Sequence, residues 1–150
     1  MRSIWILLLV TASFGQAPVA VNKAGQSSVT KLEHVVEGYL REINGKYKLR
    51  VTETTYTPGG YIGNHHHAGP GIRCIKSGEL TYVQEKQTTV YKTGDCFYES
   101  GDVSHTAYNR TKEPVLLWNF EILANDFTGA TAIPVPKGAG VVPEPKADSH

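Results

Sequence analysis

Apolar and polar residues alternate in short runs along the central part of the chain, which is the pattern of half-buried β-strands. In residues 46–57, for example, Tyr47, Leu49 and Val51 alternate with lysine and arginine, so one face of this segment should be buried. The runs follow one another closely and are bounded by turn residues, which favours a β-sandwich or barrel over alternating strands and helices. We predict strands over residues 38–43, 46–57, 62–67, 72–76, 79–84, 88–92, 96–99, 105–109 and 115–123.

Turn signals refine the first part of this prediction. Asn44-Gly45 separates residues 38–43 from residues 46–57, and this dipeptide is typical of a tight type I′ hairpin turn. The Pro-Gly-Gly sequence of residues 58–60 should then end the second strand of the hairpin.

The last predicted strand has its own alternation. The residues at even positions of 115–123 fall on one face, and we interpret this face as part of the core. They are Leu116, Trp118, Phe120 and Ile122.

The two ends of the chain differ in composition from the middle. Residues 1–17 begin with Arg2, continue with the apolar run Ile4–Val10 and end in small residues, which is typical of a secretory signal peptide. The alternative is an uncleaved N-terminal anchor. We further expect an N-terminal arm or edge element over residues 18–37, one folded domain over 38–124, and an extended, partly disordered Pro/Gly-rich tail over 125–150. The predicted location is secreted or periplasmic.

Charge excludes some classes of partner. The 150 residues contain 15 Lys and Arg against 14 Asp and Glu, and removal of residues 1–17 takes away only Arg2, which leaves 14 against 14. No basic patch or charge run is present. The sequence therefore predicts no nucleic-acid binding and, after signal cleavage, no electrostatic association with a membrane.

A pair of histidines is the first indication of a metal site. His65 and His67 are two residues apart in a predicted strand, so their side chains should project from the same face, with His66 on the other. Two imidazoles side by side on a strand are half of a metal site if a neighbouring strand supplies a third ligand.

The spacing around these residues resembles the two motifs of the cupin superfamily. The residues that fall in register are Gly59, His65, His67 and Gly78 in the first motif, and Gly94, His105 and Asn109 in the second. The chain departs from the motifs at Ser100, where the family has proline, and at Gly101, where the motif's glycine comes one place early. It also departs at Gly71, where the family has a glutamate.

The resemblance implies an all-β fold, a double-stranded β-helix or cupin jelly-roll barrel. It also implies that His105 is the third ligand of a divalent metal ion. Three-histidine sites in cupins resemble those of thiol and diketone dioxygenases, so Fe(II) is favoured, with Zn, Mn, Cu and Ni as alternatives. A small-molecule metalloenzyme of dioxygenase type is expected. The alternatives are a cupin that binds a metal or small ligand without turnover, and a cupin whose histidines are only polar lining. A homodimer through sheet faces is also compatible with the family.

Alternation around Gly71 suggests further site residues. If Gly71 faces the cavity, Arg73 does too, and it would either bind an anionic substrate group or pair with an internal carboxylate such as Glu53, Glu99 or Glu121. Tyr98 is a candidate substrate-binding residue, together with Tyr82 and Tyr108 as candidate lining residues, and Tyr98 and Glu99 are the nearest candidates for a general acid or base. Cys74 and Cys96, the only cysteines, lie on strands that are neighbours in cupins. They are either a disulfide or two buried thiols.

Overall fold

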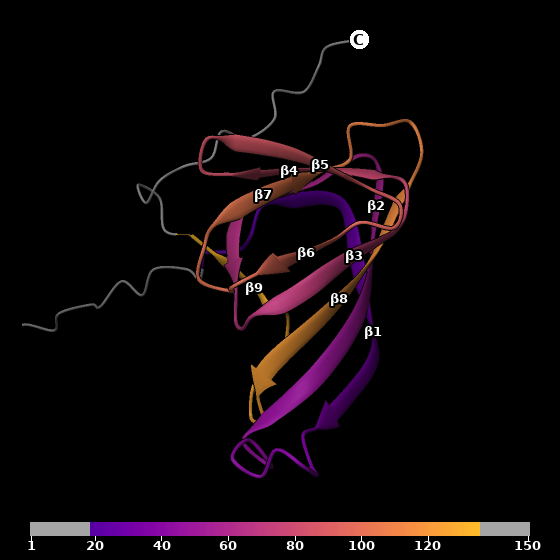
Figure 1. The fold of residues 1–150 in the computed structure, drawn as a ribbon. Helices are drawn as coiled ribbons and strands as arrows, with labels where there is room; N and C mark the ends of the chain where they lie inside the picture. The colour runs from indigo at the N-terminus through magenta and orange to yellow at the C-terminus, as the bar shows by residue number, and fades with distance from the viewer. Residues whose placement is uncertain (1–18, 136–150) are drawn as a thin grey trace, which may run out of the picture.

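The computed structural model describes residues 19–135, which form nine strands and no α-helix (Figure 1). The prediction of an all-β fold is confirmed. Within these residues no helix is long and apolar enough to span a membrane. The predicted signal peptide and residues 136–150 of the predicted tail lie outside the described residues. The strands are β1 (Lys23–Val35), β2 (Tyr47–His67), β3 (Gly71–Ser77), β4 (Glu79–Gln84), β5 (Gln87–Lys92), β6 (Cys96–Glu99), β7 (His105–Tyr108), β8 (Val115–Ala124) and β9 (Ala132–Pro134).

Strand β2 joins the two halves of a barrel. Its residues 47–56 pair with β8, and β8 continues through β3 to β6. Its residues 61–67 pair with β7 and β9, and β7 continues through β4 to β5. Strand β1 covers the free edge of β2 along most of its length (Figure 1). Two sheets that share one long strand and enclose an apolar core form the predicted double-stranded β-helix.

The expected strand end at residues 58–60 is wrong, because β2 continues through them. The pairing with β1 shifts here, so that Ala24 lies opposite Tyr61 and Gln26 opposite Tyr56. Glycine makes the close approach possible: a Cβ on Gly60 would lie 2.6 Å from the carbonyl oxygen of Gly25. The Pro-Gly-Gly sequence is therefore a point where β2 passes from one sheet to the other, and not its end.

The expected hairpin between residues 38–43 and 46–57 is also wrong. The partner of β2 is β1, and residues 36–46 form a loop between them in which Val36 N–H donates to Tyr47 O at 2.8 Å. Gly45 has a positive φ of 70°, but Asn44 does not, so a type I′ turn is not formed. The side chain of Asn44 instead donates to Gly38 O at 3.0 Å. The predicted N-terminal arm thus contains the outer strand of this pair.

The alternation predicted for residues 115–123 is right, but the buried face is the other one. Trp118, Phe120 and Ile122 are each about two fifths exposed, whereas Leu117 is 3% and Glu121 3% exposed. The inward face carries the polar residues because it lines a cavity, and the outward face is apolar. Phe120, for example, lies opposite Val51 and Ile72 on the neighbouring strands. Whether a second copy covers this outer face, as the expected homodimer requires, stays a prediction.

This reversal of faces can be measured. We expect Leu117→Ala to lower the free energy of unfolding by about 2–5 kcal/mol, because it opens a cavity in the core. Phe120→Ala should cost about 1 kcal/mol or less, since much of the ring is already in water. Urea unfolding of both variants checks this, and a Phe120→Ala cost equal to that of Leu117→Ala would contradict the assignment.

A disulfide fixes β6, the strand at the end of the sheet that runs from β2 through β8 and β3. Cys74 of β3 and Cys96 of β6 lie opposite each other and are bonded, with 22 residues of sequence separation. Among the described strands, β6 pairs only with β3, over four residue pairs. The covalent bond therefore holds one end of the strand that carries Glu99 at its other end.

Removal of this bond should destabilise the whole fold. A crosslink across a loop of this length restricts the unfolded chain and contributes about 3 kcal/mol. We expect the Cys74→Ala, Cys96→Ala double variant to lose about that much free energy of unfolding, measured by urea denaturation. Reduced wild-type protein is the matched control and should lose a similar amount. A loss below about 1 kcal/mol in both would contradict the prediction.

Candidate metal centre

The structure brings the three predicted metal ligands together at one end of the barrel. His65 and His67 lie on β2, and His105 on β7 is directly opposite His65 in the strand register. One ring nitrogen from each of the three lies within 4.8 Å of the other two. His65 and His105 are each 2% exposed. The i, i+2 spacing and the strand pairing thus produce a compact set of three imidazoles, while the Nδ1 of His66 lies 3.3 Å from Gly101 O.

Two of the histidines are oriented by backbone carbonyls. The Nδ1 atoms of His65 and His105 lie 2.8 Å from Gly63 O and 3.3 Å from Val103 O. A carbonyl only accepts, so these contacts assign the hydrogen to Nδ1 and leave the Nε2 lone pair for a metal.

Burial keeps the same two imidazoles neutral. Burial, together with the nearby His105 and His67, holds the pKa of His65 well below its ordinary value. Burial and the nearby His67 lower the pKa of His105 to about 3. Neutral imidazole is the form that binds a metal ion.

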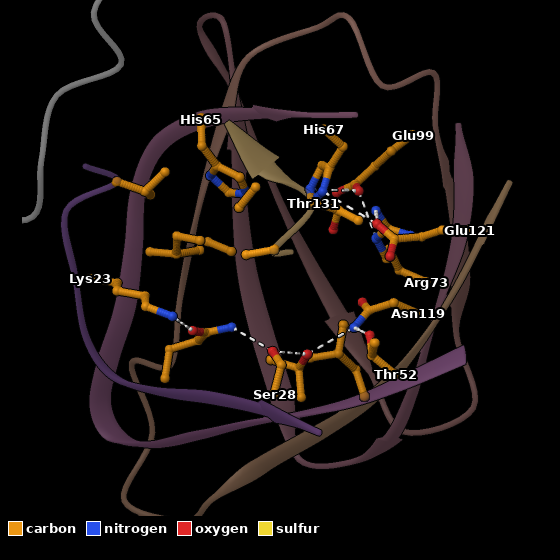
Figure 2. A pocket seen from close by; sticks show the side chains of 18 of the residues that line it. Lys23, Ser28, Thr52, His65, His67, Arg73, Glu99, Asn119, Glu121 and Thr131 are labelled. Carbon is orange, nitrogen blue, oxygen red and sulfur yellow. Dashed lines mark hydrogen bonds and ion pairs between the residues drawn. The ribbon is translucent and has the colours of Figure 1, made fainter. Parts of the chain in front are cut away.

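Three charged residues from the facing sheet meet this set (Figure 2). Glu99 lies 3.2 Å from His67 Nε2 through Oε2 and 3.1 Å from His105 Nε2 through Oε1. Glu121 Oε1 lies 3.5 Å from His67 Nδ1. Arg73 connects the two carboxylates, with Nε 2.7 Å from Glu99 and Nη2 3.1 Å from Glu121. All three side chains are at most 6% exposed.

The pKa of Glu121 reflects this network. Burial raises the pKa of its carboxyl, but the nearby His67 and the charge of Arg73 outweigh burial and leave the pKa below the ordinary value. The side chain therefore stays ionised at neutral pH despite its burial, which makes it a charged neighbour of His67.

Gly71 lies between the two acidic residues. It is opposite Glu99 on β6 and opposite Glu121 on β8. The guanidinium of Arg73 occupies the space in front of it, because a Cβ built on Gly71 would collide with Arg73 Nη1 and lie 2.6 Å from Phe120 O. The position where cupins carry a glutamate is thus filled by an arginine from two residues along the same strand.

Part of the predicted tail closes one side of the site. Strand β9 pairs with β2, with Pro134 opposite His65 and Ala132 opposite His67. Ala68 N–H donates to Thr131 O at 2.9 Å. The prediction of an extended, partly disordered tail is wrong for Ala132–Pro134, which form a strand beside the histidines. Their short apolar run, Ala-Ile-Pro, gave little signal for this.

The histidines line a cavity of about 540 Å³ inside the barrel. One wall is apolar and includes Ile62, Leu80 and Leu117. Another wall consists of hydroxyl and amide groups from β1, β2 and β8, joined by hydrogen bonds (Figure 2). They are Gln26, Ser28, Thr52, Thr54 and Asn119. The amino-acid pattern contains little that predicts this wall, apart from polar Asn119 at an inward odd position of residues 115–123.

The other predicted site residues have different outcomes. Of the two predicted roles of Arg73, the structure shows the internal ion pair, which Arg73 makes with Glu99 and Glu121 and not with Glu53. Its Nη1 has no hydrogen-bond partner within the described chain, so a substrate-binding role stays a prediction. Tyr98 requires correction: it alternates with Phe97 and Glu99, lies on the outer face and is 65% exposed. Tyr82 lines the cavity instead and stacks on His105, with 4.7 Å between ring centroids.

Comparison with known proteins now places the chain. The sequence model described as "Cupin domain" matches residues 52–122, which include all three histidines. This chain belongs to the cupin superfamily. A comparison with curated proteins finds no match.

Solved structures show the same fold at low sequence identity. A protein with a double-stranded β-helix domain from Klebsiella pneumoniae has a TM-score of 0.51 and 22% identity, over 73% of this cupin and 85% of that chain. The polyketide cyclase RemF from Streptomyces resistomycificus has a TM-score of 0.54 and 12% identity, over 81% and 83%. Oxalate oxidase in complex with the substrate analogue glycolate has a TM-score of 0.51 and 16% identity, over 68% and 52%.

A three-histidine group in a cupin suggests a divalent metal ion, and the residues present fit one. The set offers neutral imidazole nitrogens, which suit Fe, Zn, Cu and Ni. It also contains a buried acceptor, Glu99 Oε2, that has no hydrogen-bond partner in the described chain. Arg73 Nε is close to this oxygen, but the contact is an ion pair and not an aligned hydrogen bond. A buried carboxylate oxygen without a hydrogen-bond donor, next to the lone pairs of imidazole nitrogens, would be stabilised by a cation.

Burial of these histidines predicts how the stability of the metal-free protein depends on pH. In the unfolded chain their pKa is about 6.5, and in the folded cupin the pKa values of His65 and His105 are lower. As the pH falls below 6.5, the unfolded chain therefore binds protons that the folded chain does not. The free energy of unfolding then falls by up to about 1.4 kcal/mol per pH unit for each histidine. We expect a loss of about 2–3 kcal/mol between pH 7.5 and 5.5, measured by urea unfolding with a chelator present.

The His65→Gln, His105→Gln double variant is the control for this experiment. Its other titrating groups are unchanged, so most of the pH dependence in this interval should disappear. A double variant with the same pH dependence as the wild type would contradict the assignment.

Proposed function

We propose that this cupin is a metalloenzyme of dioxygenase type that acts on a small molecule and uses Fe(II) held by His65, His67 and His105. The observation that supports this most is that the three imidazoles lie close together and line a cavity inside the barrel. A metal ion in that position would face both the ligands and a bound substrate. Iron would supply redox chemistry toward dioxygen or a substrate oxygen.

The cavity supports a small, polar and partly apolar substrate. Its volume of about 540 Å³ lies in the usual range for small-molecule sites. The hydroxyl and amide wall would bind hydroxyl or carbonyl groups, and Ile62, Leu80 and Leu117 would contact an apolar part. The charge of Arg73 is already offset by two carboxylates, so a strongly anionic substrate is less favoured than a neutral one.

The similar structures support the proposal that this cupin is an enzyme, but they do not support a particular reaction. Two of the similar structures are a cyclase and an oxidase by name, which is compatible with an enzyme. Fold similarity at this identity does not transfer activity, since cupin-like barrels have many functions.

We also propose that the chain is exported, to the periplasm or the exterior. This rests on the signal-peptide pattern of residues 1–17. The disulfide between Cys74 and Cys96 supports it, because such bonds persist in oxidising compartments.

Metal content and oxygen consumption test the proposal. Protein purified without a histidine tag should retain close to one equivalent of metal, and the His105→Ala variant should lose most of it. Iron-loaded wild-type protein should consume oxygen with at least one member of a panel of small polar carbonyl and hydroxyl compounds, and the variant should not. Less than about 0.1 equivalent of bound metal at neutral pH would contradict the metal site. Tight metal retention with no oxygen uptake would favour a binding protein without turnover.

A further inference from the structure

We propose that Glu99 is a fourth metal ligand, and that it replaces from strand β6 the glutamate that cupins carry at the position of Gly71. The inference rests on the three-histidine metal site of the proposed function. It does not depend on the dioxygenase reaction or on the identity of the metal.

The first support is the geometry of the Glu99 carboxylate. Its two oxygens lie 3.1 Å from His105 Nε2 and 3.2 Å from His67 Nε2. Metal–nitrogen and metal–oxygen bonds are about 2.1 Å long, so two ligands at right angles on one ion are about 3.0 Å apart, and two at a tetrahedral angle about 3.4 Å apart. The observed distances fall between these values. They are the separations of neighbouring ligands on a shared ion.

The second support is hydrogen bonding. His105 Nδ1 faces Val103 O at 3.3 Å, which assigns its hydrogen to that nitrogen and leaves a lone pair on Nε2. A lone pair and a carboxylate oxygen repel each other unless a metal ion or a shared proton lies between them. The buried Glu99 Oε2, which has no hydrogen-bond partner in the described chain, also requires a positively charged neighbour. One divalent ion between Glu99 and the imidazoles would satisfy both atoms.

The third support is the backbone at the motif's own position. A side chain on Gly71 would start 2.6 Å from Phe120 O and would collide with Arg73 Nη1. No carboxylate fits there without movement of β8. Glu99 is opposite Gly71 in the β3–β6 register, so its carboxylate is displaced by one strand and still reaches the histidines.

Arg73 and Glu121 then have positioning roles. Arg73 binds both carboxylates and restricts Glu99 to a side-chain direction toward the site. Glu121 approaches Nδ1 of His67 at 3.5 Å, and not the Nε2 atom that faces Glu99. A carboxylate at the outer nitrogen orients the ring and does not bind the ion. The two buried glutamates are therefore expected to differ, with Glu99 as ligand and Glu121 as positioning residue.

The difference between the two glutamates provides a matched test. Co(II) affinity would be measured by chelator competition in wild type, Glu99→Gln and Glu121→Gln, together with the visible absorption of the bound Co(II). We expect Glu99→Gln to weaken Co(II) binding at least 100-fold and to change the absorption spectrum. Glu121→Gln should weaken binding by about 10–100-fold at most, as expected for a group that only orients a ligand, and should leave the spectrum as in the wild type. Circular dichroism and thermal unfolding of the metal-free proteins would check that both variants fold.

Some outcomes would overturn the inference. Affinity of Glu99→Gln within threefold of the wild type, with an unchanged spectrum, would show that Glu99 only shares a proton with its neighbours or pairs with Arg73. Equal losses in the two variants with unchanged spectra would assign both glutamates to positioning.

A crystal structure of the zinc-loaded wild-type protein gives a test that needs no variant. A Glu99 oxygen about 2.0–2.2 Å from the ion would support the inference, and a distance beyond about 3 Å would overturn it. Zinc held by the three histidines alone would overturn the inference and leave the proposed metal site intact. A wild-type protein that binds neither Co(II) nor Zn(II) would overturn both. Absence of oxygen uptake in a protein with a Glu99–metal bond would contradict only the proposed reaction.

Discussion

The buried contact between Arg73 and the two carboxylates of Glu99 and Glu121 is the constraint around which this site is arranged. Each of these charges would be costly in the interior by itself, and each is tolerated because the others are within ion-pair distance. The arrangement needs Gly71, since any side chain there would collide with the guanidinium. The glycine that interrupts the cupin motif is therefore the condition for an alternative charge network beside the histidines.

The histidines and the charged residues of the site come from different sheets. The histidines come from β2 and β7, and the charged network comes from β3, β6 and β8. The two groups meet because β2 passes from one sheet to the other at residues 58–60. Of the strands that carry the charged residues, β6 is held least firmly, because it has only β3 as a partner among the described strands. The position of the Glu99 carboxylate therefore depends on whatever else holds β6 in place. The disulfide at the opposite end of β6 supplies that support, so a bond outside the cavity helps to set geometry within it.

Sequence alone predicted what depends on local alternation and on the two motifs. The boundaries of β4 and β6 follow from period-two patterns, and the shared face of His65 and His67 follows from their His-x-His spacing. The convergence of His105 with this pair is what the cupin resemblance implies. Sequence alone did not predict what depends on the partner of a strand. The inward face of β8 carries Asn119 and Glu121 because it faces a polar cavity, and a hydrophobicity pattern assigns such a face to solvent. Likewise, the pairing of β9 with residues 65–67 is a long-range contact that leaves little local signal.

Gly71 also bears on the interpretation of the site as a whole. Taken with the motif alone, the missing glutamate is equally compatible with a cupin that has lost its metal and keeps its histidines as polar lining. In such a cupin, Arg73 would be the only permanently charged partner of the two buried carboxylates within the described residues, with His67 as a second partner only when it is protonated. Negative charge in excess of its partners costs several kcal/mol in the interior. A divalent ion among the imidazoles gives that excess negative charge a partner. The charge balance of the facing sheet therefore favours a retained metal site over a degenerate one.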